Sequence, residues 1–331
     1  MRRFECPGCG ARLYFENSRC LECGTEIGFS PARLAMVALR EGRPCGHRSG
    51  PALCNWMLDD DAAGPLCASC VLTRTLPDLS APGAPERYRI VEQDKRRLCF
   101  TLLRAGLGET MRDLRFDVLA DPVAVAGGVP SVSTGHLDGL VTLSLAEADP
   151  GYRERTRMQL AESYRTVLGH LRHESGHFFF PRLVAADADR LARFRALFGD
   201  EREDYGAALQ AHHAGERRGD PAAYVSAYAA AHPHEDWAET WAHLLHILDT
   251  LESARSLGLD AGDGPIDDPW SCRDMATLLA QFAPVVEVLN ELNRSLGHAD
   301  AWPFAPGPGV IEKLAFAHGV LPVVQGRGVR P

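Results

Sequence analysis

The clearest hydrophobic patterns along the chain have helical spacing and lie in its second half. One stripe comprises Leu160, Tyr164, Val167, Leu168 and Leu171, and another comprises Trp237, Trp241, Leu244, Leu245, Leu248 and Leu251. Asp149-Pro150 is typical of a helix start, whereas Pro181 cannot continue a helix interior. The first stripe therefore predicts one long helix between these prolines. Pro233 suits the first turn of the second helix.

The second predicted helix also has a polar face, formed by Glu235, Glu239, His243 and His246. Such a face is either an ordinary solvated surface or the lining of a functional site. His243 and His246 fit the first interpretation at least as well as the second. The choice for Glu235 depends on the chemistry of the other helix.

Strand patterning is clear in one segment, Gly139 to Leu145, where Val141, Leu143 and Leu145 alternate with Thr142 and Ser144. An extended peptide could pair with the edge of such a strand, or the strand could be purely structural. From about Tyr88 onwards the pattern is mainly helical, which predicts an α+β, mainly α fold.

Composition sets broad limits on the function. The 331 residues suggest about two domains, and the 45% of hydrophobic residues suffice for a sizeable core. We find no run of 18 apolar residues and no apolar segment before Cys6, so we expect neither a membrane span nor a secretory signal. The net charge of −9 argues against broad nucleic-acid binding.

Four of the 10 cysteines form two knuckles, Cys6-x-x-Cys9 and Cys20-x-x-Cys23. Thiolates at this spacing close a tetrahedral zinc site, and Gly10 and Gly24 allow the tight turns that follow. Residues 1–28 are therefore predicted to be a zinc ribbon, which could also contact a protein partner. Cysteines in knuckles rather than disulfides indicate a cytoplasmic protein.

A second set of cysteines, Cys45, Cys54, Cys67 and Cys70, lies in residues 29–75. It predicts a second structural zinc site, with His47 as a substitute ligand; the alternative is a set of reduced cysteines packed in a small core. Cys99 and Cys272 are isolated and are expected to be inert thiols. Residues 76–85 have the composition of a linker, and residues 86–331 form the remaining domain.

The most informative motif is H-E-x-x-H at residues 173–177. On a helix, His173 and His177 project from one face about one turn apart and can bind a single zinc ion. Glu174 is then placed to act as the general base toward a zinc-activated water. An ordinary buried or salt-bridged histidine pair is the alternative interpretation.

A catalytic zinc site needs a third protein ligand, and Glu235 is the best candidate, with Asp236 as a rival. Glu239, one turn later, would orient a liganding imidazole. Residues that could stabilise an oxyanion precede this helix, namely Tyr224, Tyr228 and His232, although each is more often a packing or capping residue.

The chain resembles a family of zinc-binding metallopeptidases that carry an N-terminal zinc ribbon. The likeness extends over most of the chain and rests on the ribbon cysteines, Cys54-Asn55-Trp56, the knuckle at 67–70, Lys95 to Leu98, Thr134 to His136, Glu147 to Asp149, Tyr164 to His170, the 173–177 motif, Phe198 to Glu201, Asp204-Tyr205 and Glu235 to Thr240. His234 and the run from Phe178 to Pro181 depart from the usual pattern. The resemblance implies a zincin-like domain with His173 and His177 on zinc and Glu174 as base. It also draws attention to His136, His170 and Tyr205, for which structural hydrogen bonding is the default.

These observations predict a zinc metallopeptidase with one catalytic and one or two structural Zn²⁺ ions, acting on a peptide or protein substrate. The alternative is a non-catalytic zinc-binding adaptor or regulator in which every metal is structural. The eight clustered cysteines and the absence of any clue to a substrate are the reasons to keep this alternative.

Overall fold

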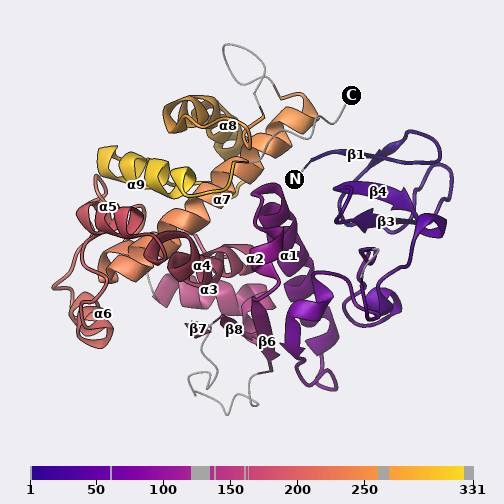
Figure 1. Cartoon of the computed structure of the whole chain (residues 1–331), viewed down its shortest axis with the longest axis horizontal. Coiled ribbons are helices and arrows are strands. Elements are labelled where there is room, and N and C mark those ends of the chain that lie inside the picture. Colours follow the sequence, from indigo (N-terminus) through magenta and orange to yellow (C-terminus); the bar gives the residue numbers. More distant parts are fainter. Residues whose placement is uncertain are drawn as a thin grey trace. The chain divides into compact units, whose positions relative to one another are not determined.

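The chain folds into two compact units, Met1–Arg155 and Thr156–Pro331, in the computed structural model (Figure 1). The structure describes residues 2–59, 62–120, 135–137, 139–159, 162, 164–259 and 268–323. Helices dominate and the strands are short, with the Cys-rich segment at the N-terminus. The predicted α+β, mainly α fold is therefore confirmed.

Two small hairpins open the first unit. Strand β1 (Phe4–Glu5) pairs with β2 (Arg12–Leu13), and β3 (Ile27–Ser30) pairs with β4 (Ala35–Ala38), both antiparallel. Each of the first two strands has only two residues, too few to bury a core. Local stability in this segment must therefore come from the cysteine clusters and from aromatic packing.

An aromatic cluster forms the core of this region. Phe100, on helix α1 (Ala84–Arg104), lies 5.3 Å from the ring centroid of Phe15 and 5.7 Å from that of Phe29. Phe4 and Trp56 complete the cluster, and all five side chains are buried. Helix α1 and the N-terminal hairpins therefore share one hydrophobic core. Short helix α2 (Gly108–Met111) follows α1, and helix α3 (Pro150–Gln159) contains the boundary between the two units.

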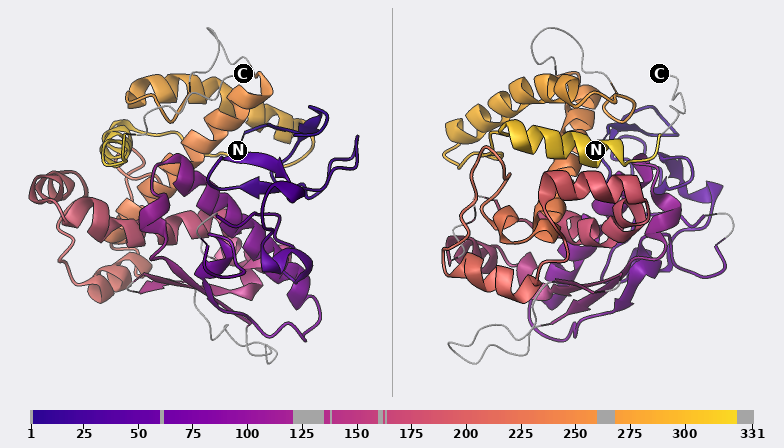
Figure 2. Two further views of the ribbon diagram at one scale, coloured as in Figure 1. Left: turned by 45° about the vertical axis from the view of Figure 1, so that its right-hand side comes forward. Right: turned by 60° about the vertical axis from the view of Figure 1, so that its left-hand side comes forward.

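A four-stranded sheet completes the first unit (Figure 2). Its strand order is β5-β6-β8-β7. Strands β5 (Thr73–Thr75), β6 (Arg115–Leu119) and β8 (Leu140–Ser144) are parallel, and β7 (Gly135–Leu137) runs antiparallel to β8. The predicted strand is thus confirmed as β8. Its suggested use as an edge for an extended peptide is wrong, because β6 and β7 already pair with both of its sides.

The second unit is helical and is built around α7 (Pro233–Leu257), which α4 (Val167–Phe180), α5 (Ala188–Phe198), α8 (Met275–Ser295) and α9 (Pro308–Gly319) contact (Figures 1 and 2). Helix α6 (Tyr205–His213) packs on the short turn Tyr228–Ala231 that precedes α7. Pro233 starts α7 as predicted. The solvated interpretation of its polar face is wrong, because Glu235, His243 and His246 are buried together with the apolar face.

The single long helix predicted between Asp149 and Pro181 is wrong. Helix α3 ends at Gln159, and α4 starts anew at Val167. The hydroxyl of Thr166 accepts a hydrogen bond from the Gly169 amide at 2.9 Å, so an N-cap interrupts the helical pattern. Leu160 lies outside the described residues. Helix α4 does end before Pro181, although a π-helical turn, Pro181–Ala185, continues the chain.

Helix α8 is the one helix in the described part of the chain with the length and mean hydropathy, 1.2, to cross a membrane. Its most apolar window is 28% buried, and the helix packs on α7 and α9. A core helix of a soluble domain satisfies the same criteria, so this single helix is weak evidence for a membrane span.

Candidate metal centres

The first cysteine cluster brings together Cys6, Cys9, Cys20 and Cys23, as the knuckle spacing predicts. The Cys6 and Cys23 sulfurs are 3.6 Å apart, and those of Cys9 and Cys20 are 3.8 Å apart. Tetrahedral ligands at the usual Zn–S distance are separated by about 3.8 Å. Gly10 and Gly24 have φ of +74° and +72°, which allows both knuckles to turn back on the site.

A second cluster contains Cys45, Cys54, Cys67 and Cys70, all buried. The Cys54 and Cys67 sulfurs are 3.7 Å apart, again the separation expected of two zinc ligands. The Trp56 amide donates to the Cys54 sulfur and the Cys70 amide to that of Cys67, both at 3.5 Å. His47 is not a member of this group, and Cys99 and Cys272 lie outside both clusters.

Helices α4 and α7 create the third cluster by packing closely against each other. The indole of Trp237 donates to the Gly176 carbonyl at 2.8 Å, and that of Trp241 donates to the Ser175 hydroxyl at 3.0 Å. A Cβ atom at Gly176 would lie 3.0 Å from the Ala238 Cα, so a larger residue would have to push the two helices slightly apart. The buried faces of the two helices thus set His173 and His177 opposite Glu235.

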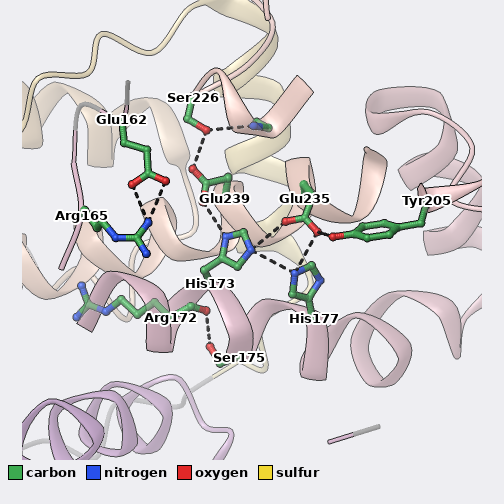
Figure 3. Close-up of polar contacts among 11 residues, drawn as sticks. Glu162, Arg165, Arg172, His173, Ser175, His177, Tyr205, Ser226, Glu235 and Glu239 are labelled. Carbon is green, nitrogen blue, oxygen red and sulfur yellow. Dashed lines mark hydrogen bonds and ion pairs between the residues drawn. The ribbon is translucent and has the colours of Figure 1, made fainter. Parts of the chain in front are cut away.

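The three side chains converge on one point (Figure 3). The Nε2 atoms of His173 and His177 are 3.2 Å apart, and the Glu235 carboxylate oxygens lie 3.0 Å and 3.6 Å from these two atoms. Tetrahedral ligands at about 2.0–2.1 Å from zinc would be separated by about 3.3 Å. The two imidazole nitrogens are close to that spacing, and Oε2 and Oε1 of Glu235 each lie near one of them, so the three side chains could hold a single Zn²⁺.

Glu239 determines which nitrogen of His173 faces that point. Its Oε1 lies 2.7 Å from the His173 Nδ1, which places a ring proton on Nδ1 and turns Nε2 toward the other donors. The second oxygen, Oε2, accepts a hydrogen bond from the Ser226 hydroxyl at 2.6 Å. Tyr205 donates its hydroxyl to Glu235 Oε1 at 3.0 Å, which restrains that carboxylate as well.

Burial and pairing have opposite effects on the ionisable groups of this cluster. Burial tends to lower the pKa of His173, but its hydrogen bonds to Glu235 and Glu239 outweigh burial and raise that pKa. Burial tends to raise the pKa of Glu235, yet His173 and His177 hold it well below its ordinary value. The same balance lowers the pKa of Glu239 to about 2. Each carboxylate is therefore charged at neutral pH, as a cation site needs.

Glu174 is a neighbour of the donor group without being part of it. Its side chain is 8% exposed, and its Oε2 atom has no hydrogen-bond partner within the described structure. Burial raises the pKa of this carboxyl, while the charges of His173 and His177 oppose that shift. A partly desolvated carboxylate with a free oxygen is suited to accept a proton.

No fourth His, Cys, Asp or Glu among the described residues joins His173, His177 and Glu235. Both cysteine clusters, by contrast, offer four sulfurs each. Closed four-ligand sites are typical of structural zinc, whereas three protein ligands leave a coordination position for water or substrate. The third cluster is thus chemically distinct from the other two.

Other residues considered from the sequence lie in different surroundings. Asp236 is paired with Lys313 at 2.6 Å and is not in the donor group. Tyr224 stacks under the same lysine, whose Nζ is 4.2 Å from the ring centroid. His232 caps α7, because its Nδ1 accepts from the His234 amide at 3.0 Å, and its Nε2 lies 3.1 Å from the Glu203 carbonyl.

Tyr228 does approach the cluster, with its ring 6.0 Å from that of His173. His243 and His246 extend away along α7 into a group of aromatic rings that includes Trp302. His170 is not among the metal donors, and the side chain of His136 falls outside what the structure describes.

Sequence reasoning missed Ser226 and the contact of Tyr205 with Glu235. Neither residue lies on the helices that carry the motif. Ser226 is 13 residues from Glu239, and Tyr205, at the start of α6, is 30 residues from Glu235. The Asp204-Tyr205 pair, to which the family resemblance draws attention, was the only available signal for Tyr205.

Two Cys₄ clusters and a His₂Glu cluster on packed helices define a zinc-binding protein with a peptidase-like helical domain. Residues 84–320 match a family described as "putative zinc-binding metallo-peptidase", and residues 3–81 match a zinc-ribbon domain family. The chain belongs to this metallopeptidase family.

Relatives that match nearly the whole of this chain occur in mycobacteria. Uncharacterized proteins of Mycobacterium tuberculosis strain H37Rv and of Mycobacterium bovis are each 42% identical to this chain over 327 residues, which is 97% of this chain and 95% of theirs. No solved structure matches the chain significantly.

Proposed function

We propose that this protein is a zinc-dependent peptidase whose catalytic centre is formed by His173, His177, Glu235 and Glu174. The observation that carries the proposal is the convergence of two imidazole nitrogens and a carboxylate at tetrahedral spacing, with no fourth protein donor among the described residues. Zinc held there would supply Lewis-acid chemistry, polarising a peptide carbonyl and making the attacking water more acidic.

The protein's own groups then account for the proton transfers. Glu174 takes the proton of the attacking water, since its carboxylate has a free oxygen beside the metal ligands. The same residue gives that proton to the amide nitrogen as the C–N bond breaks, so that a neutral amine leaves. Burial raises the pKa of Glu174, and a base with a raised pKa holds the proton more firmly between these two steps.

Tyr228 is the best-placed donor for the oxyanion. Its ring lies against that of His173, and burial, together with the charge of Glu235, raises the pKa of its hydroxyl, so that this group stays protonated. His232 is a weaker candidate, because both its ring nitrogens are engaged in capping α7 and in contact with Glu203. Hydroxyl donors directed at a developing oxyanion are typical of acyl-transfer sites.

The test compares the zinc-replete protein with its Glu174→Gln variant on a proteome-derived peptide library, with mass spectrometry to identify new chain ends. We expect the wild type to bind about three zinc ions per chain and to cut a defined set of peptides. Glu174→Gln should retain the metal and cut at least about 100-fold more slowly. Glu291→Gln, which changes an exposed carboxylate of α8, is the matched control.

Two results would contradict the proposal. Equal cleavage by wild type and Glu174→Gln would remove Glu174 from the role of base. A zinc content of about two, unchanged by His173→Ala, would leave only the cysteine sites and would favour the non-catalytic zinc-binding adaptor.

A further inference from the structure

Ser226 is hydrogen-bonded both to helix α7 and to the short turn that precedes this helix. Its hydroxyl donates to Glu239 Oε2 at 2.6 Å and accepts a hydrogen bond from the Ala229 amide at 3.1 Å (Figure 3). The first contact leads through Glu239 to the imidazole of His173. The second closes the turn Tyr228–Ala231, which carries the tyrosine that lies against His173.

A hydroxyl is suited to this position because it is donor and acceptor at once. A carboxylate held only through one oxygen can rotate about its terminal torsion, which is broad and poorly restrained. The bond from Ser226 holds the second oxygen of Glu239, and therefore fixes the plane of the carboxylate that orients His173.

The segment around Ser226 is anchored independently at its start. The Gly309 amide donates to the Ala222 carbonyl at 3.0 Å, and Lys313 Nζ donates to the Ala223 carbonyl at 2.7 Å. A Cβ at Gly307 would lie 2.5 Å from the Ala222 Cα, so the backbone of the segment before α9 packs directly on this one. At the other end, Arg217 donates to the Ala231 carbonyl at 3.1 Å. Ser226 lies between these anchors and contacts the residue that orients His173.

We propose that Ser226 is a positioning residue that couples the orientation of the metal ligand His173 to the turn that presents Tyr228. This inference rests on the proposed metal centre. Removal of the hydroxyl should free one oxygen of Glu239 and loosen the turn at the same time. Because outer-shell partners of a metal ligand commonly contribute 10- to 100-fold to affinity, and Ser226 is one step further out, we expect about a three- to tenfold effect.

The experiment uses the full chain with zinc in its cysteine sites and titrates the remaining site with Co²⁺. Ser226→Ala should bind Co²⁺ about three- to tenfold more weakly than wild type and give an altered visible absorption spectrum, because the His173 ring is less well oriented. Ser226→Thr keeps the hydroxyl and should restore both affinity and spectrum to within about twofold. Ser256→Ala, which removes a hydroxyl bond elsewhere on α7, should bind Co²⁺ like wild type.

Hydrogen exchange tests the coupling without depending on the folding of Ser226→Ala. In wild type, Co²⁺ binding should slow exchange of the Ala229 amide, whose partner is the Ser226 hydroxyl. In Glu239→Gln this slowing should be reduced, because an amide in place of the carboxylate weakens the bonds that join Ser226 to His173.

The outcomes separate this inference from the proposed function. Wild-type Co²⁺ affinity and spectrum in Ser226→Ala, or full protection of Ala229 in Glu239→Gln, would overturn the role of Ser226 and leave the metal centre intact. Failure of wild type to bind Co²⁺, or Co²⁺ binding unaffected by His173→Ala, would overturn both proposals together.

Discussion

Trp237 and Gly176 are joined by a hydrogen bond from the indole N–H to the backbone carbonyl, 2.8 Å long and buried between α7 and α4. Gly176 belongs to the H-E-x-x-H segment, and Trp237 lies two residues after Glu235. This bond, together with that from Trp241 to Ser175, helps to fix the register of the two helices within one turn of all three metal-donor residues. Because a helix side chain in a packed interface cannot shift freely, this register sets the donor spacing.

Substitution of Gly176 by alanine should disturb that register. The added Cβ would meet the Ala238 Cα at 3.0 Å and the Trp241 side chain at 3.2 Å. We expect a loss of about 1–3 kcal/mol in the free energy of unfolding, from overpacking, together with weaker Co²⁺ binding at the His₂Glu site. Urea unfolding monitored by tryptophan fluorescence, with a Co²⁺ titration, measures both. Gly206→Ala on α6, where the nearest contact is 3.4 Å, is the control, and an equal effect there would contradict the argument.

Tyr228→Phe should separate substrate binding from turnover. The variant keeps the ring beside His173 and loses only the hydroxyl, so zinc content and KM should change little. We expect kcat to fall by about 100-fold, the effect of removing one oxyanion donor. Steady-state kinetics on a peptide identified from the library is the measurement. An unchanged kcat would exclude Tyr228 as the oxyanion donor, and Tyr224→Phe, whose ring packs on Lys313, provides the comparison.

Lys313 and Asp236 form a buried ion pair that ties α9 to the start of α7. Burial already raises the pKa of Asp236 to about 7, so Lys313→Met should leave this carboxyl protonated and without its partner. We expect a loss of about 1–3 kcal/mol in the free energy of unfolding. The double variant Lys313→Met, Asp236→Leu should recover most of that loss, because it removes both charges from the interior. Denaturant unfolding of both variants tests this, and a double variant less stable than the single one would refute it.

His318 should make the second unit sensitive to acid. Burial, with a smaller effect from the charge of Arg273, lowers its pKa to about 4 from an ordinary value of 6.5. As pH falls below about 6.5, the unfolded chain takes up the proton first, so stability is lost progressively until about pH 4. We expect wild type to lose roughly 2 kcal/mol more than His318→Gln between pH 7.5 and pH 5. Denaturant midpoints at the two pH values measure the difference, and parallel pH profiles would contradict it.

The spacing of residue types over short segments was sufficient to predict those features that are determined by residues close together in the sequence. Both Cys₄ clusters, helix α7 from Pro233 and strand β8 follow from knuckle, capping and alternation patterns that act over a few residues. The meeting of Glu235 with His173 and His177 could be anticipated because the motif needs a third donor, and Glu235 was the best candidate on the second predicted helix.

Features that depend on tertiary contacts could not be predicted in the same way. Helix α4 starts anew because Thr166 caps its N-terminus, although the helical spacing of apolar residues continues across this point. His243 is buried beside Trp302, which lies nearly 60 positions further along the chain. Because local sequence does not reveal this contact, a solvent-exposed position was an equally good prediction for a polar residue. Ser226 has no periodic signature, because its importance comes from two hydrogen bonds made by a turn.

The aromatic cluster of Phe4, Phe15, Phe29, Trp56 and Phe100 bears on where the chain could be cut. Four of these rings precede α1 and one lies on it, so a fragment beginning at Ala84 would expose Phe100 and its apolar neighbours on that helix to water. Such a fragment should be poorly soluble, even though the peptidase family match begins there. We therefore expect helix α1 to need the amino-terminal segment for its stability.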